Sequence, residues 1–151
     1  MKRLILQIYI QLFVGLCISY KAENQISQQN PNSMSGTKLI IKIGQKAFAA
    51  TLLDNATVTA FKALLPLTIK MNELNNNEKF ADLSKSLPTN ASVPSSIQAG
   101  DLMMYGSRTL VLFYKGFFTS YSYTKIGKID DVSGLLAALG SGEITVSYEL
   151  Q

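Results

Sequence analysis

The sequence predicts a mainly β fold, namely a small closed or partly open antiparallel β-barrel of about eight strands with two short helices. Short runs of alternating apolar and polar residues are separated by turn residues at the spacing of hairpins. Only two segments show helical spacing, too few for the regular alternation of strands and helices in a parallel sheet. Apolar residues make up 47% of the 151 residues and charged residues 16%, so one domain can bury a core.

The N-terminal part of the chain has the pattern of an export leader followed by a linker. Residues 1–22 combine two early basic residues with an apolar run too short to span a bilayer, as in a signal peptide. Lipidation of Cys17 is the second interpretation, which makes this segment a lipoprotein leader. Residues 23–37 are rich in Gln, Asn and Ser, which predicts a flexible polar linker. We expect an exported protein, periplasmic or extracellular, or a membrane-anchored lipoprotein, with a barrel domain at 38–151.

The first half of the domain is predicted to contain strands, a helix and two turns. Gly44-Gln45 suits a type II′ hairpin turn, and residues 75–78 have the composition of another turn. Asn55 is of a helix-capping type, and we expect a helix over 56–65 that Pro66 ends. The expected strands are residues 38–43, 46–53, 67–72 and 79–83, the third with Leu67, Ile69 and Met71 turned inward.

The second half begins with a long surface loop over residues 84–100, which is rich in Pro, Ser, Thr and Ala. A second helix is predicted to run to Leu139, capped by Asp131 or Ser133 and ended by Gly140. The strands expected here are residues 101–105, 109–115, one or two within 121–129, and 144–149.

Four segments of the domain carry a resemblance to a known family. They are GQKAFAATLLDNATVTAFKALLPLTIKM, GDLMMYGSRTLVLFYKG, KIGKID and GEITVSYEL. Together they resemble the bacterial cyclophilin-like domain family, whose function is poorly characterised. The resemblance implies a cyclophilin-type barrel with a helix beside its open end. Because some members occur beside or fused to flavodoxin-like proteins, it also implies such a protein as a partner.

The chain departs from this family pattern in two places. Gly106-Ser107-Arg108 stands where family members carry a Pro-Trp-Gly-like turn, and the chain contains no Trp. The Phe-His-Arg strand motif and the Gln-Gly-Gly-Asp segment of prolyl isomerases with this fold are both absent. The resemblance therefore implies the barrel more firmly than the activity.

The composition excludes several kinds of catalysis. The chain has no histidine and its one cysteine is Cys17, which excludes His-based triads, thiolate nucleophiles and most zinc sites. No Walker A or GxGxxG pattern is present, and we expect neither a cofactor nor a metal. The net charge of +4 falls to +1 without the three basic residues of the leader, which argues against a nucleic-acid partner.

The carboxylates are expected to have structural roles. Asp130 and Asp131 are interpreted as helix-capping residues, and Asp101 as a side chain that stabilises a turn. Glu73 and Glu78 flank the Asn-rich turn and are expected on a solvated face.

Aromatic residues suggest where a ligand could bind. Seven of the fourteen Phe and Tyr residues fall within 105–123, a pattern that fits a filled barrel interior better than a nucleic-acid platform at this charge. Since Phe117 and Phe118 are consecutive, one of them must point outward and can form a wall for a ligand. The candidate binding residues are Met71, Tyr105, Arg108, Phe113, Phe118 and Tyr121.

The sequence predicts a monomeric, non-catalytic binding module for a peptide or small molecule, in which Arg108 orients a carbonyl or carboxylate. It touches the membrane only through its leader. Two alternatives remain open at this point. One is a weak peptidyl-prolyl isomerase that uses Arg108 as the polarising cation, and the other is a structural partner domain of a flavodoxin-like protein.

Overall fold

The computed structural model describes Asn30 and residues 33–151, and the structural statements below concern these residues. The predicted leader at 1–22, including Cys17, lies outside them, as does most of the predicted linker at 23–37. Both assignments stay predictions. In the part of the chain that is described, no helix combines the length and apolarity needed to cross a bilayer.

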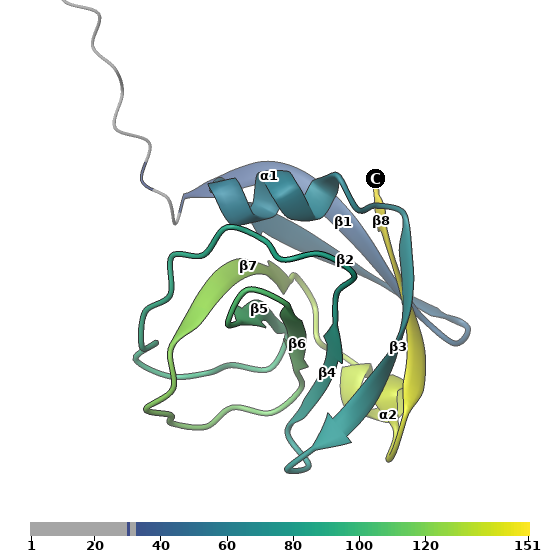
Figure 1. Ribbon diagram of the computed structural model, residues 1–151. Helices are drawn as coiled ribbons and strands as arrows, with labels where there is room; N and C mark the ends of the chain where they lie inside the picture. The colour runs from purple at the N-terminus through teal and green to yellow at the C-terminus, as the bar shows by residue number, and fades with distance from the viewer. Residues whose placement is uncertain (1–29, 31–32) are drawn as a thin grey trace, which may run out of the picture.

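Eight strands form a closed, entirely antiparallel barrel, which confirms the predicted fold class (Figure 1). Their order around the barrel is β1–β2–β7–β5–β6–β4–β3–β8, and β8 pairs with β1 to close it. The elements along the chain are β1 (Met34–Ile43), β2 (Lys46–Leu53), α1 (Ala56–Lys62), β3 (Leu67–Leu74), β4 (Glu78–Asp82), β5 (Asp101–Tyr105), β6 (Thr109–Phe113), β7 (Tyr123–Ile129), α2 (Leu135–Leu139) and β8 (Ile144–Leu150).

The hairpin turns follow the local sequence as predicted. Gly44 has φ +57° between β1 and β2 while Gln45 has negative φ, which matches a type II′ turn. In the β3–β4 turn, Asn75 and Asn76 adopt left-handed φ values of 55° and 54°, a conformation that asparagine tolerates. Strand β1 starts at Met34, ahead of the expected strand, because Met34 pairs with Leu53 beyond a shift in register.

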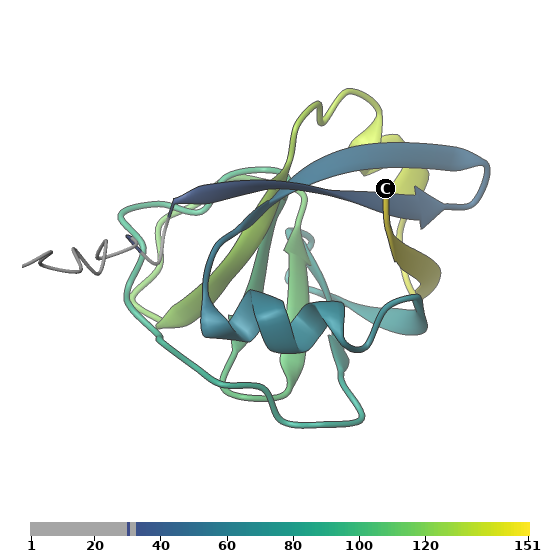
Figure 2. The ribbon, with the colours of Figure 1, turned by 90° about the horizontal axis from the view of Figure 1, so that it is seen from above.

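Helix α1 covers one end of the barrel, as Figures 1 and 2 show from two sides. Asn55 caps it, since its side-chain oxygen accepts a 2.8 Å hydrogen bond from the Val58 amide. The helix ends at Lys62 and is shorter than predicted, because the Leu64 and Leu65 amides make turn bonds to Phe61 and Lys62 before Pro66. Phe61 is buried and meets the Tyr148 ring edge-on at 6.2 Å inside the barrel.

Helix α2 lies toward the other end of the barrel in Figure 1. Its N-cap is Gly134 at φ +80°, so the predicted caps at Asp131 and Ser133 are wrong. The Asp131 carboxylate instead accepts a 2.8 Å hydrogen bond from the Ser133 amide in the turn before the helix. Gly140 ends the helix at φ +58°, as predicted.

The wall formed by β4, β6, β5 and β7 is covered on both faces. Inward residues such as Leu102 and Leu112 belong to the barrel core, whereas Met103, Val111 and Phe113 form a second apolar cluster on the outer face. This outer cluster is covered by two irregular segments, residues 84–100 and 114–122, which run around the outside of the strands (Figures 1 and 2). The first of them confirms the predicted long loop.

A buried ion pair ties the β3–β4 hairpin to the segment after α2. The Lys79 side chain is 0% exposed, and its Nζ lies 2.5 Å from Glu73 Oε2 and donates to the carbonyls of Gly140 (3.1 Å) and Gly142 (2.6 Å). Tyr114 donates a 2.7 Å hydrogen bond to the other Glu73 oxygen. Burial opposes the charged carboxylate, but the bonds from Lys79 and Tyr114 outweigh it and lower the pKa of Glu73. The expected solvated position for Glu73 is therefore wrong.

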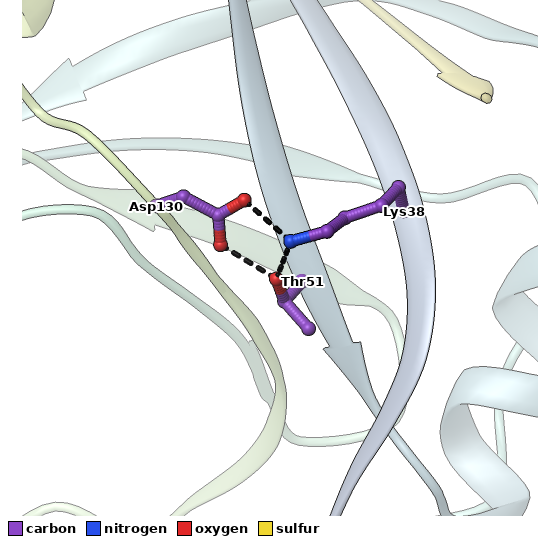
Figure 3. A network of polar contacts seen from close by, with 3 residues as sticks. All are labelled: Lys38, Thr51 and Asp130. Atoms are coloured by element: carbon purple, nitrogen blue, oxygen red, sulfur yellow. Dashed lines mark hydrogen bonds and ion pairs between the residues drawn. The ribbon is translucent and has the colours of Figure 1, made fainter.

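Asp130 joins the end of β7 to the first hairpin and does not cap a helix, contrary to prediction (Figure 3). Its two oxygens accept hydrogen bonds from Lys38 Nζ (2.8 Å) and Thr51 Oγ1 (2.6 Å). These bonds lower the pKa of Asp130. Asp101 has the predicted turn role, since its carboxylate accepts a 2.8 Å bond from the Gln98 amide.

Candidate functional site

A hollow of about 800 Å³ lies on the outer face of the barrel wall. Its lining includes Phe80, Val111 and Tyr123, which belong to or pack against the outer apolar cluster. The hollow is thus separated from the barrel core by the wall itself.

Strand alternation explains which residues of β4 line the hollow. Lys79 and Ala81 point into the barrel, so Glu78, Phe80 and Asp82 point outward into the hollow. The register then aligns a row across the wall, in which Asp82 pairs with Thr109, Thr109 with Tyr105, and Tyr105 with Tyr123.

The segment 114–122 forms one side of the hollow and is held by the long loop. Phe117 and Ile97 exchange two backbone hydrogen bonds of 2.9 and 3.2 Å. Ile97 is fully buried in the outer cluster, and Phe117 packs against that cluster. As predicted for consecutive residues, Phe118 points outward and is 86% exposed.

Aromatic rings form a connected series beside the hollow. Tyr121 meets Tyr105 edge-on at 6.1 Å, and Tyr105 lies 5.6 Å from Tyr123. Tyr123 contacts Phe113 at 5.4 Å, and Phe113 contacts Phe117 at 5.7 Å. The predicted aromatic cluster is therefore divided between a buried layer and an exposed lining, and the two meet where Tyr105 contacts Tyr123.

The hollow is also where exposed apolar side chains concentrate. Of the eight large apolar side chains that are exposed in the described part of the chain, four line it. These four are Leu74, Tyr105, Phe118 and Tyr121.

Two carboxylates line the hollow, and no Lys or Arg is found among its described lining residues. Glu78 is only 7% exposed, and its carboxylate accepts no hydrogen bond from another described residue. Burial, followed by the nearby charge of Glu73, raises the pKa of Glu78. Asp82 accepts a 2.7 Å hydrogen bond from Thr109. The predicted solvated position of Glu78 is therefore also wrong.

The pKa of Tyr123 depends on burial and on the charged groups near its ring. Burial raises the pKa of Tyr123 to about 12, with smaller contributions from the charges of Glu78, Tyr105 and Tyr121. The side-chain oxygen of Asn77, at the rim, is buried and has no hydrogen-bond partner in the described structure. The polar part of the lining thus includes two carboxylates and a buried amide oxygen without a partner.

Three of the six predicted binding residues come together here, namely Tyr105, Phe118 and Tyr121. Met71 is fully buried in the barrel core, where its sulfur accepts a 3.0 Å hydrogen bond from Tyr148. Phe113 is fully buried behind the lining. Arg108 does not line the hollow, and its guanidinium donates bonds of 3.3 and 2.9 Å to the Leu83 carbonyl.

Sequence reasoning missed Glu78, Phe80, Asp82 and Tyr123 as lining residues. The signal for the first three was the alternation in residues 78–82, where every second side chain shares a face. What the sequence did not reveal was which face points away from the barrel core.

The arrangement suits non-covalent binding. It combines an aromatic surface, two carboxylates and hydroxyl groups. In the described structure, no three side chains of His, Cys, Asp or Glu gather as metal ligands would.

Comparison with known proteins places this geometry in context. The profile of the Cyclophilin-like family matches residues 41–149. One similar solved structure is the solution structure of the hypothetical protein AF2241 from Archaeoglobus fulgidus, with a TM-score of 0.52 and 17% sequence identity. The match covers 78% of this chain and 97% of that one, and at this identity it shows the fold alone. No curated protein gave a significant match.

Proposed function

The chain belongs to the cyclophilin-like family, and from this premise we propose that it is a non-catalytic binding module for a peptide or small molecule. The proposed site is the outer-face hollow bounded by β4, Tyr105 and the segment 114–122. Its volume of about 800 Å³ falls within the usual range of ligand pockets.

The observation that carries this proposal is the gathering of exposed apolar side chains around one hollow. Phe118 and Tyr121 are 86% and 62% exposed, although the wall behind them is tightly packed. A contiguous exposed apolar patch on a folded domain is typical of an interaction site. The Tyr105–Tyr121 ring contact and the Ile97–Phe117 backbone bonds hold the tyrosines and the backbone beside Phe118 in place, which limits the ordering that binding requires.

Binding by the full chain can be tested by two-dimensional NMR of the 15N-labelled protein with a mixture of aromatic fragments and short peptides. We expect shifts at lining residues, and at least tenfold weaker binding for Phe118→Ala. Leu136→Ala removes an exposed apolar side chain on α2, outside the hollow, and should leave the affinity unchanged. Equal weakening by both variants, or shifts confined to another surface, would overturn the proposal.

The alternative activity, prolyl isomerisation, would use Arg108 to polarise a substrate carbonyl. The bonds from Arg108 to the Leu83 carbonyl, outside the hollow, argue against that role. A chymotrypsin-coupled assay with an Xaa-Pro peptide tests it directly. Catalysis by the wild type that disappears in Arg108→Ala would replace the binding proposal with the enzymatic one.

Export is proposed from the pattern of residues 1–22 alone, with lipidation of Cys17 as the alternative. The intact mass of the mature protein distinguishes cleavage from lipidation. A flavodoxin-like partner also stays a proposal, and co-purification with such a protein would favour it.

A further inference from the structure

The lining of the outer-face hollow carries charge of one sign. Glu78 and Asp82 project from the same face of β4, and the described lining residues include no basic side chain. Glu78 and Asp82 are four residues apart on β4, so their backbone positions are separated by roughly 14 Å along the extended strand. Phe80 lies between them, so the floor is apolar in the middle and acidic at both ends.

Among the aromatic rings of the lining, Tyr123 is the one linked to Glu78. Glu78 pairs with Phe113 across β4 and β6, and the Phe113 ring meets Tyr123 at 5.4 Å. Tyr105, Tyr121 and Tyr123 line the hollow with Glu78, and the Glu78 charge contributes to the raised pKa of Tyr123. The faces of aromatic rings attract cations through the ring quadrupole. Aromatic rings beside unpaired carboxylates therefore favour a positively charged ligand that also has apolar surface.

We infer that the hollow binds an organic cation whose alkylammonium group contacts the ring of Tyr123, with Glu78 as its counter-charge. This inference rests on the proposed function and adds the chemical class of the ligand. The hydrocarbon part of the ligand lies over Phe80 and against Phe118.

The state of Glu78 supports this assignment. It is nearly buried, and no basic side chain of the described lining compensates its charge. Keeping such a carboxylate unpaired is unfavourable, and a bound cation supplies the missing partner. The buried, unpartnered oxygen of Asn77 at the rim adds a further acceptor dipole beside Glu78.

The same features disfavour anionic ligands. A phosphate or carboxylate in the hollow would meet Glu78 and Asp82 without a basic side chain from its lining. Proteins that bind single-stranded nucleic acids combine aromatic platforms with positively charged grooves. Here the aromatic lining of the hollow lacks the positive charge.

The first test compares choline with dimethylbutanol, its uncharged carbon isostere, by NMR titration of the full chain. The two probes have the same shape, so a difference in affinity reports the charge. We expect choline to bind about tenfold more tightly at low ionic strength, and the difference to shrink as salt is added.

The variants connect this charge preference to the site. Glu78→Gln should bring choline down to the affinity of dimethylbutanol while leaving dimethylbutanol binding unchanged. Glu143→Gln removes the same charge from an exposed pair with Lys70 and should retain the preference. Loss of the preference in both variants would indicate a general effect of net charge and overturn the assignment.

The source of the ammonium group is tested by a second pair of probes. Nα-acetyl-lysine methylamide represents a peptide side chain, and its Nε-acetylated form is the uncharged control. A charge preference seen only with the lysine pair assigns the hollow to peptides, whereas one seen only with choline assigns it to small amines.

Failure of this inference differs from failure of the proposed function. If charged and uncharged probes bind the hollow equally, the binding module stands and the cationic ligand class is wrong. If no probe or fragment perturbs the lining residues, the proposed function itself fails.

Discussion

The inner and outer faces of strand β4 hold their charged groups in opposite ways. On the inner face, Lys79 is buried against Glu73, and Tyr114 donates to the same carboxylate. On the outer face, Glu78 is nearly as buried but has no basic partner in the lining. The pKa of Glu73 is lowered, and that of Glu78 is raised.

This difference separates groups that stabilise the barrel from a group that is available to a ligand. The paired Glu73 is more favourably charged in the folded protein than in water, whereas the unpaired Glu78 is less favourably charged. We therefore expect that removing the Glu73 carboxylate lowers the stability of the fold. Removing the Glu78 carboxylate should weaken the binding of a cation without lowering stability.

Removal of Lys79 should have the largest effect on the inner face. Lys79→Met keeps most of the side-chain volume but leaves Glu73 without its counter-charge, and we expect a loss of about 3 kcal/mol in the free energy of unfolding. Urea denaturation measures it. Lys70→Met, which breaks the exposed pair with Glu143, is the control and should change stability by less than about 1 kcal/mol.

Ile97→Ala should weaken the outer face by removing the side chain that supports Phe117. Ile97 is fully buried, and we expect a loss of about 2 kcal/mol together with weaker ligand binding, because the wall of the hollow loses its support. Denaturation and NMR titration measure the two effects. Val93→Ala, in the same loop but 55% exposed, should change neither. A large loss of stability with unchanged binding would contradict this role.

The pH dependence of stability distinguishes the paired carboxylate. Because the folded-state pKa of Glu73 is lowered, its contribution is present above the unfolded-state pKa and is lost as the pH falls through the folded-state value. Glu73→Gln leaves the buried Lys79 ammonium without its counter-charge, so it should lower stability by about 2 kcal/mol at neutral pH and by less in acid. Denaturation curves at several pH values check this. A constant difference between the proteins across the acid range would count against the pairing.

Glu78→Gln should produce the smallest change, in the opposite direction. The raised folded-state pKa means that protonated Glu78 is favoured by folding, and this contribution is lost as the pH rises through the folded-state value. At neutral pH the variant should therefore be as stable as the wild type or more stable by roughly 0.5 kcal/mol. Marked destabilisation would show that Glu78 has a stabilising partner.

Most of the fold could be predicted because its signals are local. The type II′ turn at Gly44, the Asn55 cap and the alternation of the strands each depend on neighbouring residues. The caps of α2 could not be predicted in the same way, since Asp131 bonds within its own turn and Gly134 adopts the cap position.

The candidate site was predictable only in part. The adjacency of Phe117 and Phe118 required one exposed ring, and Tyr105 and Tyr121 line the same hollow as Phe118. Arg108, by contrast, is bonded to Leu83, a residue 25 positions away that no local pattern could indicate.

The sequence by itself determined the alternation that makes the strands, the turns that join them and the absence of histidine chemistry. Only the tertiary structure decided which side of β4 faces the core, which placed Lys79 against Glu73 and left Glu78 among the tyrosines. The physical reason is that alternation specifies two faces but not their surroundings. Those surroundings depend on strand register and on loops that pack from distant parts of the chain.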